Sequence, residues 1–185
     1  MADRPPVSDL LGPDGECLHE NPWFRVMLRR SYYCIEHVHP QVVVLPLVGE
    51  DAVLVRVRRP VAGTELLELP AGGVDPGESL VEGARRELAE ESGIWVEDLA
   101  AFEPLPPLAV TPDRMPTLPH LFQVRLSEAA FEARRPHDDE VVEVVRASPA
   151  RIRSLAAEGG IRACLPMAML FRHLCTLPPP VGAHP

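Results

Sequence analysis

The chain has 185 residues, of which 46% are hydrophobic and 24% charged, and its formal net charge is −9 at pH 7. This length predicts one domain with an appended N-terminal segment, and the composition is typical of a soluble globular protein. The acidic balance argues against a nucleic-acid or anionic-membrane partner, because both need a basic surface, but it leaves a phosphate-bearing substrate open.

The cysteines and the chain's first residues bear on location in the cell. Cys17, Cys34, Cys164 and Cys175 form no CxxC pair, so the usual zinc-site spacing is missing. Met1 to Leu11 is polar and proline-rich without an apolar signal-peptide core, and no apolar run has the length of a membrane span. The sequence therefore predicts a cytoplasmic protein with reduced thiols.

The two ends of the chain differ in composition from the middle. Residues 1–20 are rich in proline, aspartate and glycine and predict a flexible N-terminal segment, and residues 178–185 predict a disordered tail. Residues 21–177 are expected to form the folded domain. Aromatic and β-branched residues from Trp23 to Val38 predict a strand pair, so residues 21–40 are candidates for dimerising strands.

Further along the chain, five segments have the composition of strands. They are Gln41 to Leu47, Ala52 to Val57, Leu66 to Leu69, Leu121 to Leu126 and Val141 to Val145. Gly49 to Asp51 suits a hairpin turn, and six prolines within residues 104–119 exclude regular structure from most of that stretch. Ser148 to Gly159 and Arg162 to Leu174 are predicted helices. This mixture predicts an α+β or α/β domain.

The segment from Gly72 to Ile94, GGVDPGESLVEGARRELAEESGI, combines a glycine-rich loop with a helix. Ser79 and Glu82 have the spacing of a capping box, and Gly93 stands where a glycine ends a helix, so Leu80 to Ser92 is predicted to be helical. The apolar face expected to meet the core comprises Leu80, Val81, Ala84 and Leu88.

Three carboxylates, Glu87, Glu90 and Glu91, share one ridge of this helix because they are three and four residues apart. Their charges repel one another, and the helix dipole disfavours negative charge at this end, so the arrangement costs stability. Spacing alone leaves two interpretations. The ridge is either a solvated acidic face or a site for a hard cation such as Mg²⁺ or Mn²⁺.

The same segment resembles the Nudix box, G-x5-E-x7-R-E-U-x-E-E-x-G-U with U apolar, at every fixed position. The matching residues are Gly72, Glu78, Arg86, Glu87, Leu88, Glu90, Glu91, Gly93 and Ile94. The resemblance implies the Nudix fold, a mixed β-sheet sandwiched between helices, with the box as a loop–helix–loop catalytic motif. It also implies a diphosphate hydrolase that depends on Mg²⁺ or Mn²⁺.

The resemblance implies a role for each charged residue of the box. Glu87 and Glu91 would be the main metal ligands, and Glu90 would share the metal or the attacking water. Glu78 would lie near the metals or hold Arg86. Arg86 would orient the glutamates through charge-assisted hydrogen bonds, a role compatible with the alternative of a surface ion pair with Glu78.

Upstream of the box, the chain is similar to ADP-ribose pyrophosphatases and nucleotide-sugar hydrolases, with LLELPAG from Leu66 to Gly72 as the shared element. In that group the residue corresponding to Ala71 offers its backbone carbonyl to a metal. Arg59 would reach the substrate phosphates, or else it is a surface arginine. A proline that shapes the substrate loop corresponds best to Pro112.

Downstream of the box, the acidic run that begins at Asp138 resembles a loop that carries a general base or an extra metal ligand. Glu140 and Asp138 are the candidates, and a solvated turn is the alternative. In the same group an N-terminal segment often completes a homodimer and holds the adenine, so Phe24 could stack on a base or pack in a core or dimer contact. His37 and His39 either mark a metal site or have no function.

These features predict hydrolysis of a nucleoside diphosphate-linked substrate. ADP-ribose or a similar nucleotide sugar, cleaved to a nucleoside monophosphate and a sugar phosphate, is the leading hypothesis. Dinucleoside polyphosphates and NADH are alternatives in the same class. A non-catalytic nucleotide-sensing module is the alternative of another class, because a fold does not fix a function.

Overall fold

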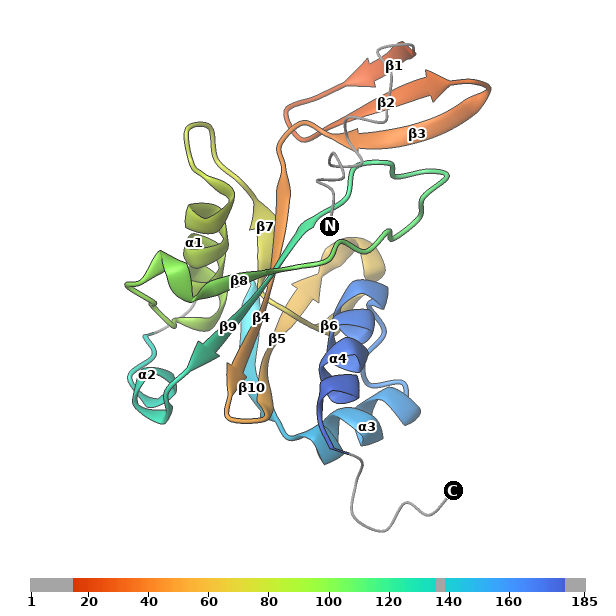
Figure 1. Ribbon diagram of the computed structural model, residues 1–185. Coiled ribbons are helices and arrows are strands. Elements are labelled where there is room, and N and C mark those ends of the chain that lie inside the picture. Colours follow the sequence, from red (N-terminus) through yellow and green to blue (C-terminus); the bar gives the residue numbers. More distant parts are fainter. Residues whose placement is uncertain (1–14, 136–138, 179–185) are drawn as a thin grey trace.

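Two β-sheets organise the chain in a computed structural model that describes residues 15–135 and 139–178. The larger sheet has seven strands among these residues, in the order β10-β5-β4-β9-β8, with β6 beside β5 and β7 beside β4 (Figure 1). Its strands are β4 (Gln41–Val48), β5 (Asp51–Arg59), β6 (Thr64–Glu68), β7 (Ala71–Gly73), β8 (Phe102–Leu105), β9 (His120–Leu126) and β10 (Val141–Ala147). Because β4 and β9 are parallel and the other pairs antiparallel, the sheet is mixed, as predicted.

Helices cover both faces of this sheet, so the predicted sandwich is confirmed. They are α1 (Leu80–Ser92), α2 (Glu128–Glu132), α3 (Pro149–Ala157) and α4 (Cys164–Thr176). Helices α1 and α2 lie on one face, and α3 and α4 lie on the other (Figure 1). Among the described residues, no helix is both long and apolar enough to cross a membrane.

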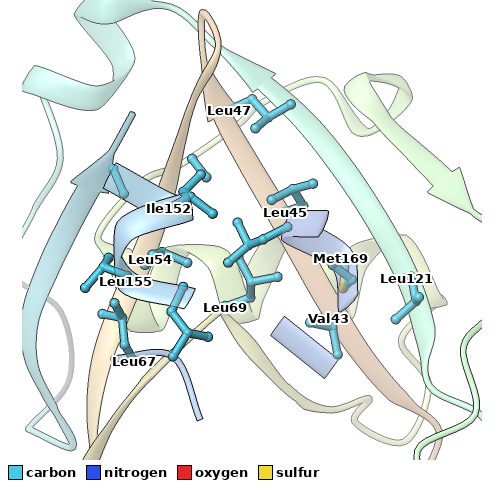
Figure 2. Close-up of a cluster of buried hydrophobic side chains, with 14 residues drawn as sticks. Val43, Leu45, Leu47, Leu54, Leu67, Leu69, Leu121, Ile152, Leu155 and Met169 are labelled. Atoms are coloured by element: carbon cyan, nitrogen blue, oxygen red, sulfur yellow. The ribbon is translucent and has the colours of Figure 1, made fainter. Parts of the chain in front are cut away.

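Strand β4 shows why its sequence is apolar throughout instead of alternating. Val42 and Val44 pack into the cluster under α1, whereas Val43, Leu45 and Leu47 pack into the cluster under α3 and α4. Figure 2 shows the second cluster, in which side chains of β4 meet those of both C-terminal helices. A strand covered on both faces has no solvent side on which polar residues would be favoured.

Helix α4 begins at Cys164 instead of Arg162 and buries Met169 and Leu170, which belong to the cluster under α3 and α4. The apolar character of this helix also predicts that Cys164 and Cys175 are buried, and this is wrong because both are exposed. They lie at the two ends of the helix, outside the stretch that faces the sheet.

Helix α1 has the predicted bounds and the predicted caps. The Ser79 side chain accepts from the Glu82 backbone N–H, and the Glu82 side chain accepts from the Ser79 backbone N–H, which completes a capping box. Gly93 ends the helix in the left-handed region, at φ +72°. Gly93 also packs closely against Arg135, because a Cβ at position 93 would overlap the backbone carbonyl oxygen of Arg135.

Gly93 and Gly159 have the same φ, but only Gly93 lies against another segment. Substituting each by alanine therefore distinguishes the cost of the left-handed backbone from the cost of the close contact. Gly159→Ala, at φ +72° in open space, is expected to destabilise the protein by about 1–2 kcal/mol, the cost of the left-handed region. Gly93→Ala should add about 1–3 kcal/mol of overpacking against Arg135. Urea unfolding of both variants measures the difference, and equal losses would contradict the contact.

The smaller sheet precedes the larger one in the chain. Its strands are β1 (Glu16–Glu20), β2 (Phe24–Arg29) and β3 (Tyr32–His37), all antiparallel. The predicted strand pair is confirmed as β2 and β3. The prediction of flexibility up to Glu20 is wrong for residues 16–20, which pair with β2. Their side chains are all exposed, so only backbone pairing defines the strand and no apolar pattern signals it. Residues 1–14 and 179–185 lie outside the described residues.

Three short elements of the domain were not predicted: β7, β8 and α2. Strand β8 contains Pro104, which lacks a backbone N–H, and such a residue is tolerated because β8 is an edge strand of the sheet. Strand β7 consists of Ala71 and two glycines, which have no β propensity. Its pairing with β4 places the glycine-rich loop against α1, where the charged residues of the helix lie.

Candidate active site

Arg86 lies at the centre of the acidic ridge of α1 and contacts three glutamates. Its Nε and Nη2 donate to the two carboxylate oxygens of Glu78 at 3.0 and 3.1 Å. Its Nη1 donates to Glu87 at 2.8 Å and to Glu90 at 3.0 Å. The hydrogen bond from Arg86 is the main cause that lowers the pKa of Glu78. One guanidinium therefore offsets the repulsion between Glu87 and Glu90 of the ridge.

Arg86 also ties the helix to the loop that precedes it. Nη2 donates to the backbone carbonyl of Gly73 at 2.6 Å, so the guanidinium joins strand β7 to the helix. Arg86 and Glu78 form the expected ion pair, and about a quarter of each side chain is exposed. A planar group that forms these bonds at once fixes the directions of the carboxylates around it.

Glu87 is the buried member of the ridge, with 8% of its surface exposed. Burial raises the pKa of its carboxyl group, although Arg86 acts in the opposite direction. Gly72 lies directly against this carboxylate, and a Cβ at position 72 would overlap it. Gly72, the first glycine of the motif, is therefore required because a larger residue would not fit beside Glu87.

Glu91 contacts the other end of β7. The backbone N–H of Ala71 donates to Glu91 Oε2 at 3.1 Å. This bond brings together the backbone of LLELPAG and the ridge, two elements that are twenty residues apart in the chain.

A cavity of about 1550 Å³ opens beside this edge of the sheet. Arg59, Ala71 and Gly72 line the part that adjoins the ridge. The remaining walls come from the link between β3 and β4, from the start of β9 and from the proline-rich stretch 104–119. This volume exceeds the roughly 300–1,000 Å³ typical of small-molecule sites, so a ligand the size of a dinucleotide can be accommodated.

Arg59, which lines the cavity, is held in place by the carboxylate of Glu68. Its Nε and Nη2 donate to Glu68 on the neighbouring strand β6 at 3.0 and 2.9 Å. The bond with Glu68 is the largest cause that raises the pKa of Arg59, and the charges of Glu91 and Glu140 contribute in the same direction. Arg59 therefore lies within electrostatic reach of both the ridge and the acidic turn.

Comparison with known proteins agrees with this geometry. The NUDIX domain family matches residues 37–165, which is more than half of the chain and includes the whole ridge.

The chain belongs to the Nudix hydrolase family.

Relatives of this Nudix chain include proteins named "Phosphatase NudJ" from Escherichia coli strain K12 and from Shigella flexneri. Each is 32% identical over 102 residues, an alignment that covers 55% of this chain and 64% of the relative. The aligned part is thus less than two thirds of the length of these curated relatives.

Nudix enzymes generally use divalent cations such as Mg²⁺, and the oxygen donors of this Nudix box fit such an ion. Glu87 offers a buried carboxylate in a space kept clear by Gly72, where a cation would compensate for burial of the charge. Within residues 15–135 and 139–178, no three histidine, cysteine or carboxylate side chains converge as ligands. Glu87 and Glu90 instead turn to Arg86, and Glu91 turns to Ala71.

Glu140 lies in the turn directly before β10. Its backbone carbonyl accepts from the N–H of Arg58 at 3.1 Å, which holds the turn against the end of β5 that carries Arg59. The structure thus brings Glu140 to the same end of the sheet as Arg59. Asp138, the other candidate in this turn, and the neighbouring His137 lie outside the described residues.

The two remaining predicted site residues lie apart from the cavity. Phe24 is in β2 of the smaller sheet, where its ring lies 6.2 Å from that of His19. Pro112 is an exposed residue of the proline-rich stretch. Neither is among the described residues that line the cavity, which takes prolines from the same stretch at positions 104, 107 and 119 instead. Their roles in substrate binding stay predictions.

Sequence reasoning missed residues that only the fold brings together. Glu68 was visible within LLELPAG, but its bond to Arg59 depends on the pairing of β5 with β6. His120 and Thr117 line one cavity with His37, about eighty residues away in the chain, which the sequence had suggested only as part of a possible metal site with His39. Burial lowers the pKa of His37 and of His120 and so favours their neutral forms.

Proposed function

We propose that this Nudix protein hydrolyses the diphosphate bond of a nucleoside diphosphate derivative. ADP-ribose or a nucleotide sugar is the leading substrate, with a nucleoside monophosphate and a sugar phosphate as products. The position of the ridge carries the proposal, because Ala71 and Gly72 contact its carboxylates and also line the large cavity. A diphosphate at this edge would have carboxylates on one side and room for the attached groups on the other.

Each residue has a part in this proposal. Glu87, Glu91 and the Ala71 carbonyl would hold Mg²⁺ or Mn²⁺, with Glu90 and Glu78 nearby. The cation, when bound, would supply positive charge that offsets the charge developing on the diphosphate oxygens. Arg86 orients the carboxylates through the bonds described above.

Two further groups act on the substrate and on water. Arg59 would bind phosphate oxygens, with its guanidinium oriented by Glu68. Glu140, or Asp138 of the same turn, would accept the proton of the attacking water, since a carboxylate occupied by a cation is a poor proton acceptor.

Metal removal tests this proposal. Incubation with ADP-ribose, a nucleotide sugar, NADH and a dinucleoside polyphosphate should give turnover of at least one compound with Mg²⁺ or Mn²⁺, with products identified by mass. EDTA should abolish that turnover, and added Mg²⁺ should restore it. Full activity in metal-free buffer would contradict the assigned role of the ridge.

The smaller sheet supports a homodimer. Val26 pairs with Ile35 and Leu28 pairs with Tyr33, so these four apolar side chains share one face of the sheet. Ile35 is 41% and Tyr33 61% exposed. An apolar face of this kind favours self-association, and a two-fold dimer is the commonest form.

Light scattering at micromolar concentration should give the mass of a dimer, and Tyr33→Glu should shift it to that of a monomer. Arg25→Glu, on the same sheet but at an exposed position of the other face, is the charge-change control. A monomeric wild type would refute the dimer.

A further inference from the structure

The cavity beside the ridge is almost without charge. Arg59 is the only arginine among the described residues that line it, and aspartate, glutamate and lysine do not occur among them. Most of the wall is valine, leucine and proline, including Val110, Leu118 and Pro119. A group that enters this space loses water, and among the described lining residues it meets no permanently charged side chain other than Arg59.

Arg59 itself is committed to the edge of the cavity that adjoins the ridge. Its two bonds to Glu68 fix the guanidinium on that side, where Ala71 and Gly72 also lie. The diphosphate would take this cation. A second anionic group elsewhere in the cavity would then lose water without a further arginine or lysine among the described lining residues, which is unfavourable.

The other polar side chains in the wall are three histidines, a glutamine and a threonine, which can all form hydrogen bonds without carrying a charge. Burial lowers the pKa of both His37 and His120, which favours the uncharged form of each ring. Thr117 also lines the cavity, and its Oγ1 is buried without a hydrogen-bond partner among the described residues. Neutral donors and acceptors between apolar walls suit a nucleobase, which has apolar faces and polar edges.

We infer that this cavity receives the nucleoside half of the substrate as an uncharged base and ribose, and that it discriminates against a nucleoside bearing an additional phosphate. The inference rests on the proposed function. It narrows the substrate to nucleoside diphosphate derivatives whose ribose is not phosphorylated.

The test compares ADP-ribose with ADP-ribose 2′-phosphate, which differs only by one phosphate on the adenosine ribose. We expect kcat/KM for the phosphorylated compound to be lower by at least about tenfold, mainly through KM. Equal kcat/KM values would overturn the inference and leave the proposed function standing. Turnover of neither compound would remove ADP-ribose as substrate, and the inference with it.

A variant that adds a cation to the wall tests the same point from the protein side. Val110 lines the cavity and is 45% exposed, so an arginine there is compatible with folding. Val110→Arg should reduce the discrimination between the two compounds by at least about threefold. Phe171→Arg, on α4 at a 66% exposed position away from the cavity, adds the same charge and should leave the ratio as in wild type. If Val110→Arg and Phe171→Arg give the same ratio of kcat/KM values for the two compounds, the nucleoside half does not bind in this cavity.

Discussion

Glu91→Gln is expected to lower kcat by at least about 10³-fold while the chain remains folded. The substitution removes a negative charge from the group proposed to hold the cation, and an amide is a much weaker ligand for Mg²⁺ than a carboxylate. It keeps the shape of the side chain and an oxygen that can accept from the Ala71 N–H. Loss of one like charge on the ridge should leave stability unchanged or slightly higher.

Steady-state kinetics with saturating Mg²⁺ measure the rate, and thermal unfolding in EDTA measures stability without the cation. Glu97→Gln is the control, because Glu97 is exposed and lies beyond the helix. A Glu91→Gln enzyme with a near wild-type rate would show that Glu91 is not a ligand. A variant that no longer folds would assign Glu91 a structural role through its contact with Ala71.

Glu140→Gln is expected to lower kcat by about 10²–10⁴-fold, the usual effect of losing a general base, and to change KM much less. The turn that carries Glu140 is fixed to β5 by the bond from Arg58, next to the proposed phosphate ligand Arg59. A carboxylate there would lie near the proposed phosphate ligand without belonging to the box. Asp138→Asn is the next candidate.

The matched control is Glu143→Gln, which removes the same charge from β10 three residues away, where the carboxylate pairs with exposed Arg56. It should change kcat by no more than a few-fold. If Glu140→Gln, Asp138→Asn and the double variant all behave like this control, the base lies within the box or is bulk water.

Local signals in the sequence were sufficient for the catalytic helix. Ser79, Glu82 and Gly93 define α1 through contacts within a few residues, so its bounds could be predicted without knowledge of the fold. The same holds for β4, whose apolar run reports burial on both faces. The Nudix family followed from nine residues of one segment, and the family comparison confirms it.

Features that depend on pairing between distant segments could not be predicted. Strand β1 has no apolar pattern, and β7 has too little side chain to show one, so only their partners reveal them. The cavity also has no signature in the sequence, because His37 and His120 come to line the same space only when β4 pairs with β9. Pro112 fitted the spacing of a loop proline, yet other prolines of that stretch line the cavity.

The contact between Gly72 and the Glu87 carboxylate restricts the order in which this protein can change. While position 87 carries a long side chain, any residue larger than glycine at position 72 must displace it. Once position 87 has been shortened, position 72 is released and can accept a methyl group or more. Reversion of position 87 alone would then be blocked by its neighbour. A lineage that first loses the carboxylate and then fills the space would therefore need two coordinated substitutions to recover it.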